Sequence, residues 1–324
     1  MIEARNISAA PGNGDDLDPD IRRFHRIVTA DYAKFASKGG GFAARRETAE
    51  RVRRPWAENG PVMAVTTELR VGPYGVPIRI HRPQQDAPSA TLVYLHGGGW
   101  VMFSMNTHDR LMREYAARGN FAVVGVDYSL APEVRFPRPL DEIVSVLDWL
   151  AQHGAEYGLD SARMAIGGDS AGANLALAAA LKLRDAGGRT PDALLLNYGA
   201  YDTASSLSFS RYDGPGYMLT ADEMREFWSC YLGDQVANPA ALATPLRCRL
   251  EGLPPAFLCV AECDVLADQN EELARRLRAA SVDTTMVKYR GATHSFLEAV
   301  SISCLASRAL DDAAAWVSQR LGAI

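Results

Sequence analysis

Ser170 lies in a pattern that suits a nucleophile. It is the centre of Gly168-Asp169-Ser170-Ala171-Gly172, which falls between a run expected to be a strand and a run expected to be a helix. A sharp strand-to-helix turn brings the two backbones together, so small residues are needed two positions before and after the serine. The exposed hydroxyl can attack a carbonyl carbon once a base takes its proton. Taken alone, the same pattern also fits an ordinary glycine-rich turn.

A His-Gly-Gly-Gly-Trp motif directly follows a strand expected to end at residue 95. Acyl transfer needs backbone N–H groups that can bind the negative oxygen of the transition state, and glycines let the backbone approach it. We expect the N–H groups of Gly98, Gly99 and Ala171 to converge on that oxygen, the last at a helix N-terminus that favours negative charge. His96 and Gly97 are expected to support the loop. The alternative is a loop that is only flexible.

His294 is the only histidine that follows Ser170 in the chain. It is expected in a loop after a strand, at the edge of the sheet where the serine should lie. Imidazole suits a general base near neutral pH, because its ordinary pKa is about 6.5. The order serine, acid, histidine along the chain favours this role, and a surface histidine without a role is the alternative.

Three carboxylates follow the last strand expected before the histidine, and one of them should orient it. These are Glu262, Asp264 and Asp268. Asp268 is expected to cap the next helix in a capping box with Glu271, which leaves Asp264 favoured over Glu262. Its carboxylate would accept the second N–H of His294, which fixes the tautomer and stabilises the imidazolium.

A further set of residues lies near the segments expected to form a pocket or a lid. They could confine the acyl or alcohol group of a substrate, and core packing is the alternative for each. The set consists of Trp100, Met102, Asp169, Tyr201, Tyr217 and Met218.

The elements that must position these residues alternate between strands and helices. Alternation and β-branched runs predict a hairpin over residues 65–82, then short buried strands separated by amphipathic helices. The expected strands are 91–95, 121–126, 164–166, 193–197, 256–261 and 284–289, and the expected helices are 140–158, 171–184, 271–280 and 307–321. The fold class is therefore α/β, a mostly parallel central sheet flanked by helices, with the active site at the carboxyl ends of the strands.

Two segments fall outside this alternation and predict a cap. Residues 16–58 are charged and carry apolar positions at helical spacing, which indicates one or two amphipathic helices. Residues from 201 to about 238 are rich in serine and aromatic residues and interrupt the strand and helix pattern. We expect residues 1–58 to form a helical cap segment, and residues 59–324 a catalytic domain whose cap excursion spans about 201–238.

Composition bounds the partners and the compartment. The chain has 324 residues and a formal charge of −5, so it has no basic face for nucleic acid. The sequence shows no export signal and no apolar run of membrane-spanning length, so we expect a cytoplasmic protein without membrane contact. Five cysteines fit reduced thiols, and Cys259 and Cys263 suit buried positions better than a metal site. No metal or cofactor is expected, and a homodimer is one option.

The motifs together resemble the bacterial branch of the hormone-sensitive lipase family of α/β hydrolases. The resemblance covers nearly the whole chain from about residue 60, and is carried by residues 96–100, 127–133, 168–172, 264–268 and the loop around His294. It implies the α/β-hydrolase fold with a helical cap, and cofactor-free hydrolysis of esters with short acyl chains by Ser170, Asp264 and His294. The chain departs from the family pattern at three positions, Ser129, Gln269 and Ser295.

We therefore expect a serine carboxylesterase that hydrolyses small, short-chain acyl esters through an acyl-serine intermediate. An amidase or formamidase acting on N-acyl small molecules is the second expectation, because formamidases resembling this fold carry a similar glycine loop. A receptor without catalysis on a hydrolase fold is a third, and the presence of three triad candidates argues against it.

Overall fold

Eight strands form one twisted sheet at the centre of the molecule. The computed structural model describes residues 14–36, 39–85 and 88–323. Within them the sheet order is β1-β2-β4-β3-β5-β6-β7-β8, antiparallel from β1 to β4 and parallel from β4 to β8. The strands are β1 (Val65–Val71), β2 (Val76–Arg82), β3 (Ser89–Leu95), β4 (Ala122–Val126), β5 (Leu159–Asp169), β6 (Ala193–Asn197), β7 (Ala256–Cys263) and β8 (Thr284–Thr293).

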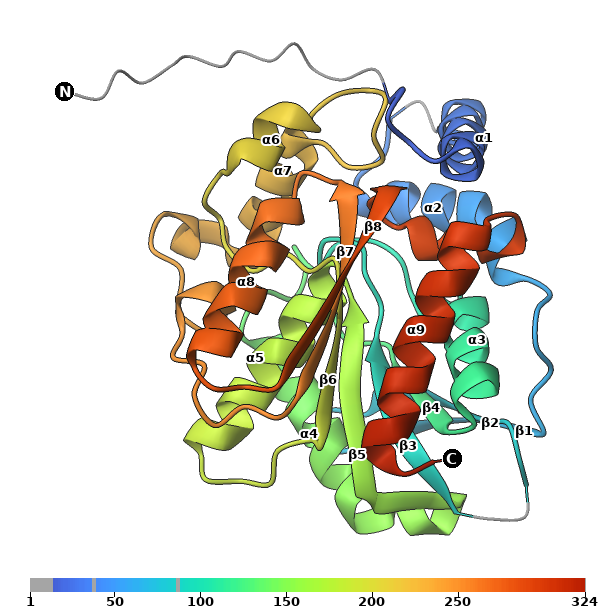
Figure 1. Ribbon diagram of the computed structural model, residues 1–324, viewed down its shortest axis with the longest axis vertical. Helices are drawn as coiled ribbons and strands as arrows, with labels where there is room; N and C mark the ends of the chain where they lie inside the picture. The colour runs from blue at the N-terminus through green and yellow to red at the C-terminus, as the bar shows by residue number, and fades with distance from the viewer. Residues whose placement is uncertain (1–13, 37–38, 86–87, 324) are drawn as a thin grey trace.

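Helices cover both faces of this sheet, which is why its inner strands are mostly apolar. On one face lie α3 (Asp109–Gly119) and α9 (Cys304–Leu321), and on the other lie α4 (Arg138–His153), α5 (Ala171–Asp185) and α8 (Ala267–Ala279) (Figure 1). Every residue of β4 and β6 is buried. Two large apolar clusters, one on each side of the sheet, make up the core.

The predicted hairpin and the predicted order of strands and helices are confirmed. Residues 193–197 form a strand as expected, whereas β5 extends five residues before and three after the expected 164–166. The helix expected over 140–158 ends earlier, because Gly154 starts a short 3₁₀ turn, η1 (Gly154–Tyr157), that Gly158 closes in the left-handed conformation. The helix α3 was not individually predicted.

Asp268 does not cap its helix. Helix α8 begins at Ala267, with Leu266 at the N-cap position, so Asp268 already lies inside the first turn. Its carboxylate accepts the backbone N–H of Ser208 at 2.8 Å instead. The predicted capping box with Glu271 is therefore wrong.

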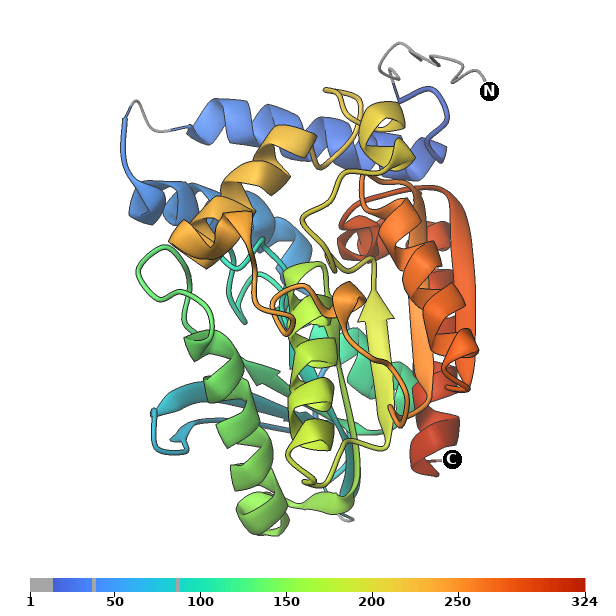
Figure 2. The ribbon, with the colours of Figure 1, turned by 90° about the vertical axis from the view of Figure 1, so that its left-hand side faces the viewer.

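Helices from two distant parts of the chain lie across the carboxyl ends of the strands. Figures 1 and 2 show α1 (Pro19–Phe35) and α2 (Phe42–Ala57) beside α6 (Leu207–Arg211) and α7 (Ala221–Leu232) at this end of the molecule. The two N-terminal helices confirm the helical pattern predicted for residues 16–58. We call α1, α2, and the segment from α6 through α7 the cap.

Ion pairs and backbone contacts fix the cap to the sheet. Arg45 of α2 reaches Glu226 of α7 with two hydrogen bonds, of 2.5 and 2.9 Å. Arg46 donates to the backbone carbonyls of Val101 and Ala131, both at 2.7 Å. Helix α2 is thus joined both to the other half of the cap and to the loop that follows β3.

Candidate active site

Ser170 lies at the junction of β5 and α5 in a strained backbone conformation. Its φ of 54° and ψ of −118° are unusual for a residue with a side chain. A Cβ on Gly168 or Gly172 would collide with the backbone carbonyl of Leu95, so both neighbours must be glycine for the turn to close. The turn is held by a 2.9 Å hydrogen bond from the Ser170 N–H to the Asn197 carbonyl.

His294 connects Ser170 to a carboxylate. Its Nε2 lies 2.9 Å from the Ser170 Oγ, and its Nδ1 lies 2.7 Å from Oδ2 of Asp264. All three side chains are buried. Burial opposes the charged form of the imidazole, but the Asp264 carboxylate outweighs burial, so the pKa of His294 is raised above its ordinary value. The imidazole is therefore placed to take a proton from the serine.

The other carboxylates near β7 have different partners. Glu262 accepts the backbone N–H of Gly291 at 3.0 Å and so fixes the end of β8. The second oxygen of Asp264 accepts the backbone N–H of Leu266 at 3.0 Å, which holds the carboxylate toward the histidine. Among the three alternatives left by the sequence, Asp264 is the one that contacts His294.

The glycine loop after β3 borders the same cavity as Ser170 and His294. Gly98 and Gly99 have φ values of 110° and 60°, in the left-handed region that favours glycine. A Cβ on Gly98 would collide with the Met102 carbonyl, and one on Gly99 would collide with the Phe227 ring. Gly98 and Gly99 lie with Ser170 at the cavity wall, and Ala171 is the first residue of α5. The structure thus brings the three predicted oxyanion residues to one place.

His96 lies behind the loop, as a support would. Its Nδ1 lies 2.7 Å from the Gly97 carbonyl, and its ring stacks on Tyr128 with the ring centres 4.4 Å apart. The Tyr128 hydroxyl donates to the His96 carbonyl at 2.7 Å. Burial, and then the nearby His108, lower the pKa of His96 to about 4, so its imidazole is neutral and Nδ1 can donate.

Asp169 also lies behind the loop, which corrects its assignment to the pocket. Its Oδ1 accepts from the Tyr94 hydroxyl at 2.9 Å, and its Oδ2 lies 3.3 Å from Nε2 of His108. Burial disfavours the imidazolium, but the Asp169 carboxylate outweighs it and raises the pKa of His108. A Cβ on Gly97 would collide with the Asp169 carboxylate, so the carboxylate packs directly against the loop.

Comparison with known proteins agrees with this geometry. The sequence profile of the alpha/beta hydrolase fold family matches residues 92–298. The chain belongs to this family. An acetyl esterase of Salmonella paratyphi B is 36% identical over 277 residues, which cover 83% of this chain and 84% of the relative. The acetyl esterase of Salmonella typhi has the same identity over the same shares of both chains.

Solved structures of similar proteins support the same assignment. An α/β hydrolase enzyme from the metagenome of Lake Arreo superposes with a TM-score of 0.88 at 30% identity, covering 95% of this chain and 99% of that one. A hyperthermophilic esterase of Pyrobaculum calidifontis gives a TM-score of 0.86 at 30% identity, covering 94% and 98%. This α/β hydrolase is of the hormone-sensitive lipase type, and it is a carboxylic ester hydrolase acting on small esters, as the motifs predicted.

The hydrolase has a cavity of about 660 Å³ between the cap and the ends of the strands. Ser170 and His294 lie on its wall, together with three of the residues predicted for the pocket, Met102, Tyr217 and Met218. The cap supplies most of the remaining wall. A substrate must therefore fit within this cavity to reach the serine.

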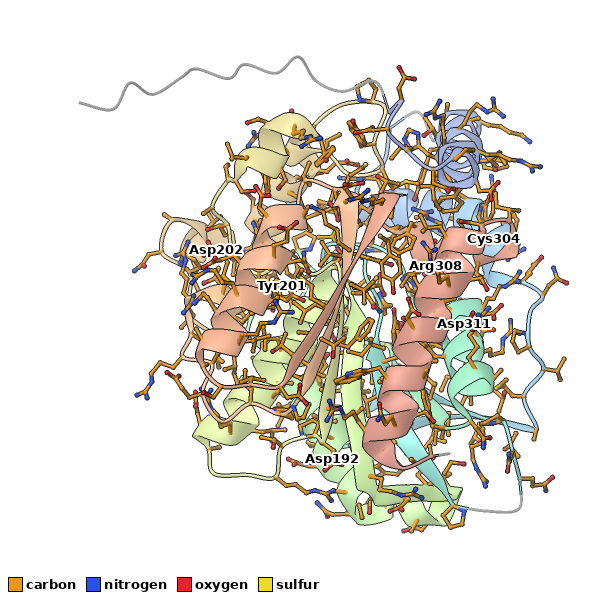
Figure 3. All side chains as sticks on the ribbon, viewed as in Figure 1. Asp192, Tyr201, Asp202, Cys304, Arg308 and Asp311 are labelled. Carbon is orange, nitrogen blue, oxygen red and sulfur yellow. The ribbon has the colours of Figure 1, made fainter. Side chains whose placement is uncertain are left out.

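Two aromatic residues predicted for the pocket belong to the core instead. Trp100 is fully buried and stacks on Tyr231 of α7, with ring centres 4.5 Å apart. Tyr201 is also fully buried, and Figure 3 places it beside α8, whose Gln269 accepts the Tyr201 N–H at 3.0 Å. Neither residue contributes to the cavity wall. Core packing, the alternative allowed for each, is the correct interpretation.

The three departures from the family pattern have local partners. The backbone N–H and the hydroxyl of Ser129 donate to the Glu142 carboxylate at 2.8 and 2.7 Å. Gln269 accepts the N–H of Asp202 at 3.0 Å and donates to its carbonyl at 3.0 Å. Ser295 adopts a left-handed φ of 60°, a position that favours glycine. None of these contacts involves the side chain of Ser170, Asp264 or His294.

Sequence reasoning missed much of the cavity wall, including a charged residue, Arg53. Arg53 of α2 is only 3% exposed and faces the cavity from the cap. The buried face of α2 also includes Ala49, Val52 and Trp56. Arg53 interrupts this apolar stripe, and a charged residue at a buried position was the available signal.

Two further findings bear on the environment of the enzyme. Among the described residues, no helix is both long enough and apolar enough to cross a membrane. All five cysteines are free thiols, and Cys259 and Cys263 are buried as predicted.

Proposed function

We propose that the hydrolase cleaves esters by a two-step acyl transfer. Ser170 Oγ adds to the ester carbonyl carbon while His294 Nε2 takes its proton, and the imidazolium then gives that proton to the departing alcohol. Water, deprotonated by His294, attacks the acyl-serine and releases the acid. Asp264 orients the imidazole and stabilises its charged form.

The observation that carries this proposal is the continuous chain of contacts from the serine to the carboxylate. Its two distances, 2.9 Å from Ser170 Oγ to His294 Nε2 and 2.7 Å from Nδ1 to Asp264, are those of hydrogen bonds. The N–H groups of Gly98, Gly99 and Ala171 would bind the oxyanion, since they border the space in front of the serine.

We propose short acyl chains, acetyl above all, as the substrates. The acetyl esterases that resemble this chain at 36% identity support this choice, and so does the cavity of about 660 Å³, which limits the size of the ester. Residues 1–58 and about 201–238 would act as the cap that excludes bulk water. Cytoplasmic location and homodimer formation stay predictions from the sequence.

Replacing Ser170 with alanine tests the proposal directly. Hydrolysis of 4-nitrophenyl acetate should fall by roughly a millionfold, because removal of a nucleophilic serine leaves only binding and oxyanion stabilisation. Labelling by a fluorophosphonate probe should disappear with it. The control is Ser210→Ala, an exposed serine of α6, which should keep both. Full turnover in Ser170→Ala would refute the mechanism, and faster cleavage of an N-formyl arylamine than of the ester by the unaltered enzyme would favour an amidase.

A further inference from the structure

Arg53 is a buried, charged residue, and some of its N–H groups make no hydrogen bond. Its side chain is 4% exposed, and Nη1 lies 3.3 Å from Oε2 of Glu298, itself 4% exposed. Within the described parts of the chain, neither Nε nor Nη1 of Arg53 makes a hydrogen bond. Burial opposes the charged form, but Glu298 and Tyr32 together outweigh burial, so the pKa of Arg53 is raised and the guanidinium stays charged. Unmade hydrogen bonds of a buried charge cost free energy unless a ligand completes them.

Three aromatic rings lie around the guanidinium of Arg53. The Arg53 Cζ lies 5.1 Å from the centre of the Phe103 ring, 5.8 Å from Phe24 and 5.9 Å from Tyr32. Rings at these distances interact with the face of a guanidinium. The N–H groups lie in the plane of the guanidinium, so a further acceptor can still approach Nε and Nη1, which make no hydrogen bond although Nη1 has an ion pair with Glu298.

Two contacts place this guanidinium close to the reacting atoms. A Cβ on Gly98 would lie 2.9 Å from the Phe103 ring, the ring on which Arg53 rests. Nη2 of Arg53 lies 4.0 Å from the sulfur of Met218, whose N–H donates to the Thr293 hydroxyl at 3.2 Å, one residue before His294. Arg53 is therefore separated from the oxyanion loop by the Phe103 side chain and from His294 by Met218 and Thr293, and Arg53, Gly98 and His294 line the same cavity.

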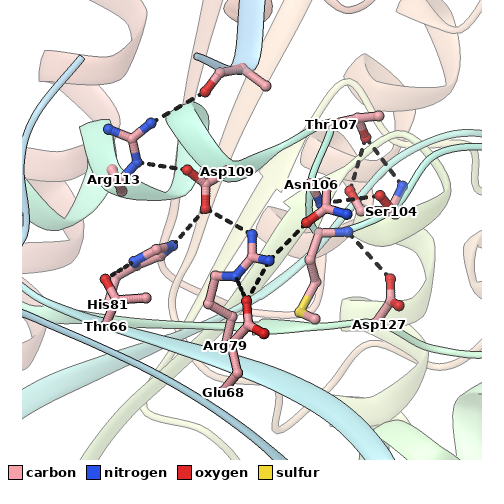
Figure 4. Close-up of polar contacts among 12 residues, drawn as sticks. Thr66, Glu68, Arg79, His81, Ser104, Asn106, Thr107, Asp109, Arg113 and Asp127 are labelled. Carbon is pink, nitrogen blue, oxygen red and sulfur yellow. Dashed lines mark hydrogen bonds and ion pairs between the residues drawn. The ribbon is translucent and has the colours of Figure 1, made fainter. Parts of the chain in front are cut away.

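Other arginines of the molecule show what a satisfied guanidinium looks like. Figure 4 shows Arg79, which donates to Glu68 and Asn106 at 2.7 Å and to Asp109 at 2.8 Å. Arg45, on the same helix and the same cavity as Arg53, is held by both oxygens of Glu226. Arg53 differs because it faces the substrate cavity with open donors.

We propose that Arg53 binds a second, uncharged hydrogen-bond acceptor of the substrate, a carbonyl or ether oxygen beyond the scissile ester. The charges of Arg53 and Glu298 cancel, so a neutral acceptor completes the guanidinium without adding charge. A carboxylate would bring a second negative charge beside Glu298 into a buried site. The inference rests on the proposed esterase function and adds a substrate class: short esters that carry another oxygen function, such as diesters of small diols or keto esters.

The test compares matched substrates that differ only in the second acceptor. Ethylene glycol diacetate is compared with pentyl acetate for the alcohol side, and methyl levulinate with methyl pentanoate for the acyl side. In the wild type, kcat/KM should favour the oxygen-bearing ester in at least one pair. In Arg53→Met/Glu298→Gln, which removes both charges together, that ratio should fall about tenfold, as expected for one hydrogen bond to a charged donor.

Two further variants control for loss of a cap ion pair in general and for failure of the double variant to fold. Arg225→Met/Asp222→Asn removes an exposed ion pair of cap helix α7 that does not line the cavity, and it should change the ratio less than about twofold, because an exposed pair contributes little. Arg53→Lys keeps a cation for Glu298 and so remains usable where the double variant fails to fold. It too should lower the ratio, since a lysine does not present the same planar donors.

The outcomes separate this inference from the proposed function. An unchanged ratio in both Arg53 variants, for both pairs, overturns the inference while the esterase mechanism stands. A wild type that prefers monomethyl succinate to methyl pentanoate shows a site for carboxylate and also overturns it. A wild type that hydrolyses neither these esters nor 4-nitrophenyl acetate refutes the proposed function itself.

Discussion

The catalytic triad on the sheet side of the cavity and Arg53 on the cap side differ in how fully their polar atoms are paired. On the sheet side both nitrogens of His294 and both oxygens of Asp264 have partners within 3.0 Å. On the cap side Nε and Nη1 of Arg53 make no hydrogen bond among the described residues, and Nη1 has only its ion pair with Glu298 at 3.3 Å. A complete network holds reacting groups in one geometry before substrate arrives, whereas an incomplete one gains its last partner from the ligand. The sheet side should therefore set the rate for every ester, and the cap side should set which ester is preferred.

Breaking the network on the sheet side at Asp264 should give the largest effect after loss of the serine. In Asp264→Asn, kcat should fall by roughly 10⁴-fold, because the amide no longer fixes the tautomer or stabilises the imidazolium. The base must be neutral, so wild-type kcat/KM should rise with pH through a midpoint above 6.5, in line with the raised pKa of His294. Without the carboxylate that raises it, the midpoint should move to lower pH.

A pH–rate series on the two proteins measures both effects. The control is Glu262→Gln, whose amide oxygen can still accept the Gly291 N–H, so its rate and midpoint should match the wild type. Equal losses in Glu262→Gln and Asp264→Asn would show that the assignment of the acid is wrong.

The oxyanion loop should give an intermediate effect. Gly98 has a φ of 110°, and in Gly98→Ala the new methyl group would collide with the Met102 carbonyl. The loop must therefore shift, which displaces an N–H group that would bind the oxyanion. We expect kcat for 4-nitrophenyl acetate to fall about 100- to 1000-fold, with the same factor for all esters of the panel. Gly187→Ala is the control, because Gly187 has a φ of 68° and no atom within 4 Å. A loss in Gly98→Ala that depended strongly on the substrate would contradict the division between the two sides.

The smallest effect on activity is expected at Asp109, whose hydrogen-bond network lies away from the substrate cavity. Asp109 accepts from Arg79, His81 and Arg113 (Figure 4). Burial raises its pKa, but His81 and Arg113 outweigh burial and lower it to about 2. Asp109→Asn should lower the melting temperature by a few degrees at pH 7 and leave kcat/KM unaltered.

The pH dependence of this stabilisation has a definite sign. A carboxyl with a lowered pKa contributes stability above about pH 4, and that contribution is lost as the pH falls from about 4 to about 2. Thermal melts of the two proteins should therefore converge in that interval. A large loss of activity in Asp109→Asn at pH 7 would mean that this cluster also supports the reaction.

How much the sequence reveals depends on whether a residue's role is local. Gly168 and Gly172 could be recognised because the turn itself demands them, and the order of strands follows from apolar runs that must be covered on both faces. Trp100 and Tyr201 were misplaced because an aromatic residue beside a motif packs into the core as readily as it lines a cavity. The Asp169 side chain points behind the glycine loop and not into the cavity, and the sequence does not show the direction of a side chain at a turn.

The cap shows the same limit. Its helices could be predicted from their spacing of apolar residues, and burial of Phe24 and Val28 follows from that spacing. The partner of Arg53 could not be predicted, because Glu298 lies 245 positions further along the chain. Pairing between residues so far apart in the chain depends on the whole fold, and no local sequence pattern predicts it.

One helix carries both Arg46 and Arg53. They are two turns apart on the same face, separated by about 10 Å along the axis. Arg46 donates to the carbonyls of Val101 and Ala131 beside the oxyanion loop. Helix α2 therefore holds the guanidinium of Arg53 at a fixed distance from the place where the ester carbonyl reacts. The hydrolase should then discriminate between esters by the length of the spacer between their two oxygen functions. A spacer one methylene too short or too long would lose the hydrogen bond to Arg53.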